Sequence, residues 1–250
     1  MTDCDHSKCQ SLALAKGLGL GVSLQYLNET RADLDQPGKH VYFYVVSTVK
    51  LNKGEFCQTG SAPNFHGGRL SLCTCKHWMR ALKEPDDWVG NWVAGFTGIH
   101  EGGGDRRNKL IFLMRIDRAY LSFYKLWQEN MSDQDLLAAK NSRKSQFGDF
   151  YEPKSELRAD KIHESDSYYP PMVGHSHHTN EFDNRWRNDI DYNKGKRPPS
   201  LLLGSPSASF LWSKPLLALH DCKPTHGRGF GRNHRLMSYS NFVTSLREMI

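Results

Sequence analysis

The fold is decided by the stretch Val41-Tyr-Phe-Tyr-Val-Val-Ser-Thr-Val49. Its residues are almost all β-branched or aromatic, which is the composition of β-strands. Because no polar residue interrupts it before Ser47, we expect this strand to be buried on both faces. The turn-rich segment Asp35-Gln-Pro-Gly38 precedes it. We therefore expect residues 1–39 to form an N-terminal appendage and residues 40–250 to form the main domain.

Strand and helix patterns follow one another downstream. We expect strands at residues 70–74, 88–97, 109–116, 201–203, 210–212 and 216–219, and helices at residues 77–83, 122–129, 133–144 and 239–249. Residues 152–199 are polar, charged and nearly free of aliphatic side chains, which indicates a long polar insertion. The sequence thus predicts an α+β fold, with a small mixed β-barrel or sheet and peripheral helices.

The composition favours an anionic partner and excludes a membrane protein. The 250 residues carry a formal net charge of +6, which favours DNA or a nucleotide as the partner. No apolar run approaches the roughly twenty residues that span a bilayer. The 6 cysteines indicate free thiols rather than a disulfide framework, so we expect a cytoplasmic protein. The sequence identifies neither a cofactor nor an oligomeric state.

A basic loop near the C-terminus has the chemistry of a phosphate site. It reads His226-Gly-Arg-Gly-Phe-Gly-Arg-Asn-His-Arg235. Glycines let backbone amides approach an oxyanion, and guanidinium groups bind it with two parallel hydrogen bonds. We assign phosphate contacts to Arg228, Arg232, His234 and Arg235, and add Lys76 and Arg115 as further basic residues of the nucleotide site. The alternative is a solvated turn.

Aromatic residues upstream of the basic loop suggest a surface for a base. Trp88, Trp92 and Phe96 alternate along the strand expected at residues 88–97. If that face opens to a pocket, Trp88 and Trp92 stack on a base, a contact worth roughly 1 to 3 kcal/mol. The alternative is that these rings form part of the core.

A histidine cluster lies within the polar insertion. It reads His175-Ser-His177-His178 and is followed by Glu181 and Asp183. Histidine titrates near neutrality, and a carboxylate partner makes it a usable general acid or base. We expect His177 or His178 to pair with Asp149 or Asp183, which makes Asp149, His177 and His178 the candidate catalytic residues. The alternative is a solvated loop.

The segment Cys73-Thr-Cys75-Lys-His77 has residue types that bind zinc, with Cys57 and His66 upstream. The spacing lacks a second Cys-x-x-Cys or a histidine pair, so we predict no metal site. A nucleophilic thiol at Cys75 beside Lys76 is a further alternative.

The order of these segments resembles the "nucleotide modification associated domain 2" family of bacteria and phages. The matching segments are Tyr42-Phe-Tyr-Val-Val46, Ala62-Pro-Asn-Phe65, Leu72-Cys-Thr-Cys-Lys76, Val89-Gly-Asn-Trp-Val-Ala-Gly95, Leu110-Ile-Phe-Leu-Met-Arg-Ile116, Phe123-Tyr-Lys-Leu-Trp127, Gly148-Asp149 with Tyr151, His175 to His178, and Gly227-Arg-Gly229 running to His234-Arg235. The resemblance implies a role in DNA base modification or phage defence. One departure is Asn91, because the family pattern has an aspartate there.

The order of strands and helices is also similar to the PUA-like superfamily, which includes the EVE, ASCH and YTH domains. That similarity implies recognition of RNA or of a modified base that is stacked on aromatic side chains. Two functions follow. We predict that the protein recognises a modified base in an aromatic pocket without changing it, with the phosphate held by the basic Gly/Arg loop. The alternative is an enzyme that modifies a nucleotide or DNA base with the Asp/His cluster as general acid and base.

Overall fold

The computed structural model describes residues 10–12, 19–99, 107–192, 197–220 and 234–249. Contacts within the chain define two compact units. The first unit contains Met1–Thr59, Gly90–Arg115 and Ser207–Ile250, and the second contains Gly60–Val89 and Ile116–Pro206. The chain passes from one unit to the other within two long strands, β8 (Leu110–Tyr120) and β9 (Leu201–Leu211).

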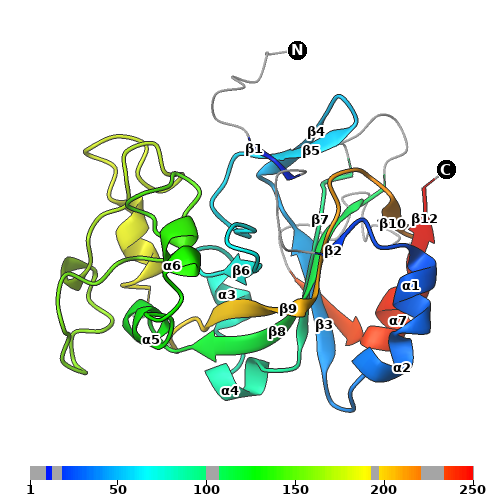
Figure 1. Ribbon diagram of the computed structural model, residues 1–250, viewed down its shortest axis with the longest axis horizontal. Helices are drawn as coiled ribbons and strands as arrows, with labels where there is room; N and C mark the ends of the chain where they lie inside the picture. The colour runs from blue at the N-terminus through cyan, green and yellow to red at the C-terminus, as the bar shows by residue number, and fades with distance from the viewer. Residues whose placement is uncertain (1–9, 13–18, 100–106, 193–196, 221–233, 250) are drawn as a thin grey trace. The chain divides into compact units, whose positions relative to one another are not determined.

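A mixed sheet forms the first unit around β3 (His40–Val45), whose four central residues are buried (Figure 1). Strand β3 pairs in parallel with β7 (Trp92–Phe96) and antiparallel with β11 (Arg235–Ser238). The strand order is β11-β3-β7-β8-β9-β2, where β2 is Gly19–Leu20. A Cβ at Gly95 would lie 2.1 Å from the Phe112 ring, so only glycine lets that ring cover β7.

Three short helices pack together beside this sheet: α1 (Leu24–Glu29), α2 (Arg31–Leu34) and α7 (Tyr239–Thr244) (Figure 1). The buried ring of Phe242 on α7 lies 5.9 Å from Phe43 and 6.0 Å from Phe96, which joins the helix to β3 and β7. Smaller antiparallel sheets contain β1 (Gln10–Ser11), β5 (Glu55–Gln58) and β4 (Val49–Asn52), and β10 (Leu217–Leu219) with β12 (Leu246–Glu248).

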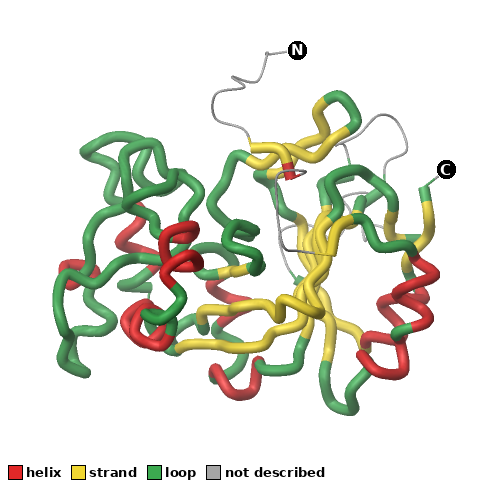
Figure 2. The backbone as a smooth tube through the Cα atoms, viewed as in Figure 1, coloured by secondary structure: helices red, strands yellow, loops and turns green. Residues whose placement is uncertain are grey.

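The second unit has little regular structure. It contains β6 (Ser71–Leu72), which pairs with β9, the helices α3 (His77–Arg80), α4 (Pro85–Trp88), α5 (Phe123–Glu129) and α6 (Gln134–Lys140), and the 3₁₀ turns η3 (Ser165–Ser167) and η4 (Arg185–Asp189). Figure 2 shows that residues 141–200 run mainly as loops. Buried aromatic rings at Tyr151, Tyr168 and Trp186 hold these loops to a core with Phe123 and Ile190.

The predicted α+β class and mixed sheet are confirmed. The barrel alternative is wrong for the described residues, because their strands form open sheets. The prediction that Trp88 and Trp92 share one strand is also wrong. Pro85 fits the first turn of a helix, and Asp86 and Asp87 favour it electrostatically, so Trp88 ends α4 and β7 begins at Trp92.

Two further expectations have different outcomes. None of the helices in the described part of the chain is long and apolar enough to cross a membrane. Cys57 is disulfide-bonded, which corrects the expectation that all the cysteines are free thiols. The boundaries at residues 39 and 40 and the insertion at residues 152–199 stay predictions.

Candidate active site

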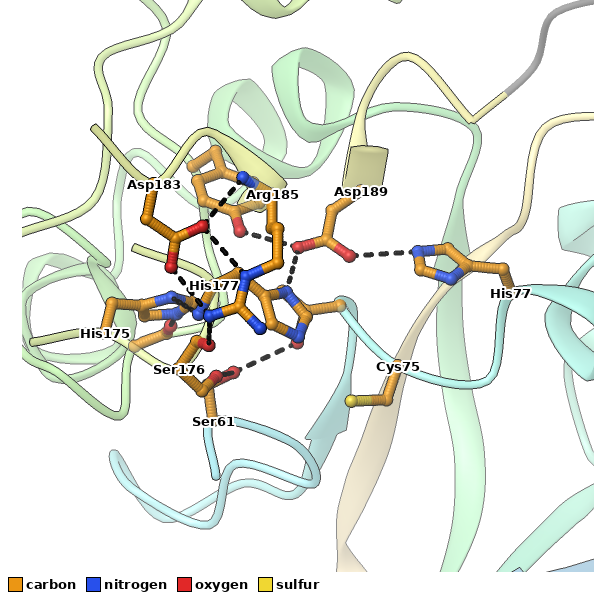
Figure 3. Close-up of polar contacts among 12 residues, drawn as sticks. Ser61, Cys75, His77, His175, Ser176, His177, Asp183, Arg185 and Asp189 are labelled. Atoms are coloured by element: carbon orange, nitrogen blue, oxygen red, sulfur yellow. Dashed lines mark hydrogen bonds and ion pairs between the residues drawn. The ribbon is translucent and has the colours of Figure 1, made fainter. Parts of the chain in front are cut away.

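One buried carboxylate in the second unit contacts two histidines. Oδ2 of Asp189 lies 2.7 Å from Nδ1 of His177, and Oδ1 lies 3.0 Å from Nε2 of His77. The first contact is a hydrogen bond, whereas the second has the distance of an ion pair without hydrogen-bond geometry. Figure 3 shows Asp189 between the two rings, with one oxygen directed to each. The Asp189 side chain is 1% exposed, and the His77 and His177 side chains are 19% and 25% exposed.

Each member of this group comes from a different local structure. His77 is the first residue of α3, directly after Lys76, which adopts a left-handed conformation with φ 57°. The buried Arg80 fixes this short helix by donating to the carbonyl oxygens of Cys75, Pro199 and Ser200. Asp189 is the last residue of η4. The cluster therefore depends on tertiary contacts rather than on one sequence motif.

The surroundings shift the pKa values of the two histidines in opposite directions. Burial lowers the pKa of His177, but the hydrogen bond and charge of Asp189 outweigh it, so this pKa lies above its ordinary value. Burial also lowers the pKa of His77, and here Asp189 does not outweigh it, so this pKa lies below its ordinary value. Opposite shifts of neighbouring titratable groups are typical of an acid and a base in one active site.

The carboxylate of Asp189 stays ionised in this setting. Burial raises its pKa, but the contacts with His177 and His77 outweigh burial and hold the pKa below its usual range. The phenol of Tyr151 donates a third contact to Oδ2 at 2.8 Å. Among the residues that the structure describes, Nε2 of His177 has no partner, so it is open to a ligand.

His175 holds the histidine loop in place. Its Nδ1 accepts from the backbone N–H of His177, and its Nε2 lies 2.9 Å from the carbonyl oxygen of Gly148. These two bonds fix the neutral tautomer with the proton on Nε2. Burial lowers the pKa of His175 to about 4, which keeps the ring neutral at neutral pH. His175 is thus a structural residue beside the candidate site.

Asp149 belongs to a second, fully buried polar network. Both of its oxygens accept from Oγ of Ser71, at 2.8 and 2.9 Å. Nζ of Lys140 donates to the same Oγ at 2.8 Å and to Asn64. Burial lowers the pKa of Lys140 to about 8. All four residues are at most 1% exposed, so this network holds the fold together rather than facing a ligand.

The predicted pairing of the catalytic residues is corrected by this geometry. His177 pairs with Asp189, and neither Asp149 nor Asp183 takes that place. Nδ1 of His178 contacts the backbone oxygen of Asp183 at 2.6 Å, whereas the Asp183 carboxylate pairs with Arg185. Of the predicted catalytic residues, only His177 therefore lies in the cluster around Asp189.

Neither predicted stacking residue offers a free ring. Trp88 is 0% exposed in the second unit and donates from Nε1 to the carbonyl oxygen of Arg80. Trp92 is 1% exposed in the first unit, with its ring 4.8 Å from that of Tyr239. Both tryptophans serve as core residues in this structure, which is the alternative that the sequence left open.

The predicted phosphate residues are divided between the units. Arg115 lies opposite Trp92 in the register of β7 and β8, and Arg235 begins β11. The ring of His234 lies 6.1 Å from that of Tyr42, also in the first unit. Lys76 is half-buried in the second unit. Arg228 and Arg232 lie outside the described residues.

The cysteine segment lacks the features of a metal or nucleophile site. No group of three or more potential metal ligands gathers within the described residues. Burial raises the pKa of Cys75 to about 11 and that of Cys73 well above its usual range, so both are thiols at neutral pH. His77, which the sequence places in this segment, instead contacts Asp189.

Asp189 is not among the site residues predicted from the sequence. It lies in the polar insertion, where a carboxylate is the expected solvated residue. One local pattern in the sequence could have indicated that Asp189 is buried. It stands between Trp186 and Ile190, two apolar residues at helical spacing that are both buried.

The fold and the site define an α+β protein with a buried carboxylate that contacts two histidines. The sequence matches the nucleotide modification associated domain 2 family over residues 39–188, and the chain belongs to this family. The family is associated with nucleotide modification. Neither the curated proteins nor the solved structures include a match to this chain. The family match ends one residue before Asp189.

Proposed function

We propose that this protein is an enzyme of a nucleotide-modification system, in which His77 and His177 transfer protons at a nucleotide unit, either free or within DNA. The observation that carries this proposal is the arrangement of both imidazoles on Asp189, with Nδ1 of His177 bonded to the carboxylate and Nε2 open. A carboxylate that orients one ring nitrogen leaves the other to exchange a proton with a substrate. The family supplies the nucleotide context.

The two histidines take different roles. The pKa of His177 lies above its ordinary value, so this ring carries a proton nearer to neutral pH and acts as the general acid. The pKa of His77 lies below its ordinary value, so this ring is neutral and acts as the general base. Asp189 orients the rings and stabilises the charge of His177.

Recognition of a base without chemistry is the second candidate function. The side chain of Trp78 is 67% exposed, and its ring stands edge-on to Tyr192 at 6.4 Å, while Tyr192 stacks on His77 at 4.3 Å. An exposed aromatic ring beside a stacked pair offers a base a surface to stack on. In this function the histidines read the edge of the base.

The two functions are separated by analysis of nucleosides. DNA and free nucleotides from cells that express the wild type, His177→Ala, His77→Ala or the control His220→Ala are digested and examined by mass spectrometry. His220 is an exposed residue of the first unit. An enzyme changes a nucleoside in the wild type and the control but in neither active-site variant. Identical nucleosides in all four samples would reject the enzyme and favour the reader.

A further inference from the structure

A pocket in the second unit has the residues of a ligand site. Its volume is about 360 Å³, which lies in the range of small-molecule sites. Its lining includes Lys154, His178, Glu181, Asn184, Trp186 and Arg187. None of them takes part in the contacts of Asp189 described above.

One side of the pocket offers positive charge and hydrogen-bond donors. Lys154 is exposed, and its ammonium group has no salt bridge or side-chain hydrogen bond in the described part of the chain, although its charge acts on the Asp166 carboxylate. The guanidinium of Arg187 lies 5.2 Å from the centre of the Trp186 ring. It donates a hydrogen bond to Oγ of Ser165 and forms an ion pair with Asp166. A phosphate is the anion that such a lysine and arginine bind best.

The other side offers hydrogen-bond acceptors. His178 is 7% exposed, and its Nδ1 contacts the Asp183 backbone oxygen and therefore carries the proton. This leaves Nε2 as an acceptor, and no partner for it occurs within the described ranges. The carboxylate of Glu181, also in the lining, is a second acceptor. The ligand therefore needs hydroxyl or amino donors as well as an anionic group.

The pocket lies on the same turn of chain as the candidate active site. The backbone N–H of Trp186, in the pocket wall, donates to the carbonyl oxygen of His177 at 3.0 Å. His177 and His178 are consecutive, yet the first contacts Asp189 and the second lines the pocket. A ligand held here reaches the segment that carries His177.

We propose that this pocket binds a nucleoside monophosphate, with the phosphate at Lys154 and Arg187 and the sugar hydroxyl or base amino groups at His178 and Glu181. This assignment rests on the proposed function and names its substrate class. A nucleoside monophosphate matches both sides of the pocket, because it combines one anionic group with several neutral donors. Inorganic phosphate satisfies the basic side alone and is repelled by Glu181.

Calorimetric titration of the full chain with deoxyadenosine 5′-monophosphate, deoxyadenosine and inorganic phosphate tests the pocket. We expect the nucleotide to bind more tightly than either fragment. Lys154→Ala should weaken nucleotide binding about tenfold or more, since a hydrogen bond to a charged group is worth about 1.5 to 3 kcal/mol. Lys161→Ala, a control in the same unit whose lysine pairs with Glu164, should bind as the wild type does.

Glu181→Gln should strengthen the binding of inorganic phosphate, whereas Lys154→Ala should weaken the binding of the nucleotide. Glu181→Gln removes the repulsive carboxylate, so inorganic phosphate should bind several-fold more tightly while the fold is kept. The proposed nucleotide site would be rejected if the wild type bound no nucleotide, or if the wild type and Lys154→Ala bound it equally tightly. His177→Ala separates the two proposals, because it should retain nucleotide binding and lose turnover. Turnover at the wild-type rate by this variant would reject the catalytic role of His177 while leaving the nucleotide pocket intact.

Discussion

The phenol of Tyr151 donates to Oδ2 of Asp189 at 2.8 Å. This is the oxygen that also bonds to His177, so the phenol and the imidazole share one acceptor. Both Tyr151 and Asp189 are buried, and water has little access to replace either partner. The tyrosine therefore helps to hold the carboxylate in the orientation that serves the histidines.

Tyr151→Phe is expected to destabilise the protein by about 1.5 to 3 kcal/mol, because a hydrogen bond to a buried charged group is lost. Chemical denaturation measures this change. The matched control is Tyr169→Phe, since Tyr169 is half-buried and its ring covers Arg143 without a hydrogen bond from its hydroxyl within the described residues. Equal stability of the two variants would show that the Tyr151 bond contributes nothing.

Asp189→Asn is expected to lower the pKa of His177 below its ordinary value. The raised pKa depends on the carboxylate, and burial alone lowers it. NMR titration of the histidine side chains measures the change. The control Asp166→Asn removes an exposed carboxylate that pairs with Arg187, and it should leave the pKa of His177 unchanged. An unchanged pKa in Asp189→Asn would contradict the assigned partner.

Acid should destabilise the protein through His175. Its folded pKa of about 4 lies below the unfolded value of about 6.5, so its stabilising effect is complete above pH 6.5 and is lost as the pH falls towards 4. The loss is about 3 kcal/mol for this group alone. His175→Gln should be less stable at neutral pH and should lose less stability over this range. Parallel stability curves for the two proteins would contradict this account.

The buried Lys140 and Asp149 should behave as a unit. Lys140→Met leaves the carboxylate uncompensated and is expected to cost about 3 to 5 kcal/mol. The double variant Lys140→Met, Asp149→Asn should lose much less than the sum of the two single changes. A double-mutant cycle by denaturation measures the coupling, with the exposed Lys144→Met as the control. Additive effects would mean that the two charges do not interact.

Gly148→Ala is expected to destabilise the second unit by about 1 to 3 kcal/mol. A Cβ at this position would lie 2.6 Å from the carbonyl group of Asn141 and from the backbone nitrogen of Ser142, which cannot move aside as a side chain can. Gly54→Ala has no atom within 4 Å of its Cβ and should cost less, although its φ of +82° adds strain. Thermal unfolding compares the two variants.

Local patterns predicted those parts of the fold that depend on local forces. The pattern that predicts β3 is a short run of β-branched and aromatic residues, and the pattern that predicts α5 is the amphipathic face of one helix. Each pattern lies within a few consecutive residues, so a short stretch of sequence contains the whole signal. The signal for α4 was also local, because Pro85 stands at its first turn, but the tryptophan pattern suggested a strand instead. A pattern of apolar residues alone did not separate a buried helical turn from a strand.

The candidate site was less predictable because its contacts join distant residues. The histidine loop was recognised from its composition, but the partner of His177 depends on how the polar insertion folds back on the core. Asp149, Asp183 and Asp189 are the same residue type in the sequence, and only the packing decides which of them reaches the imidazole.

Sharing one carboxylate makes the two imidazoles a single titrating system. A proton on His177 lowers the affinity of His77 for the next proton, so the cluster binds its first proton more readily than its second. The apparent pKa values of its titration curve therefore belong to the cluster, because the protonation of one ring changes the pKa of the other. Substitution of either histidine should therefore shift the midpoint of the histidine that remains.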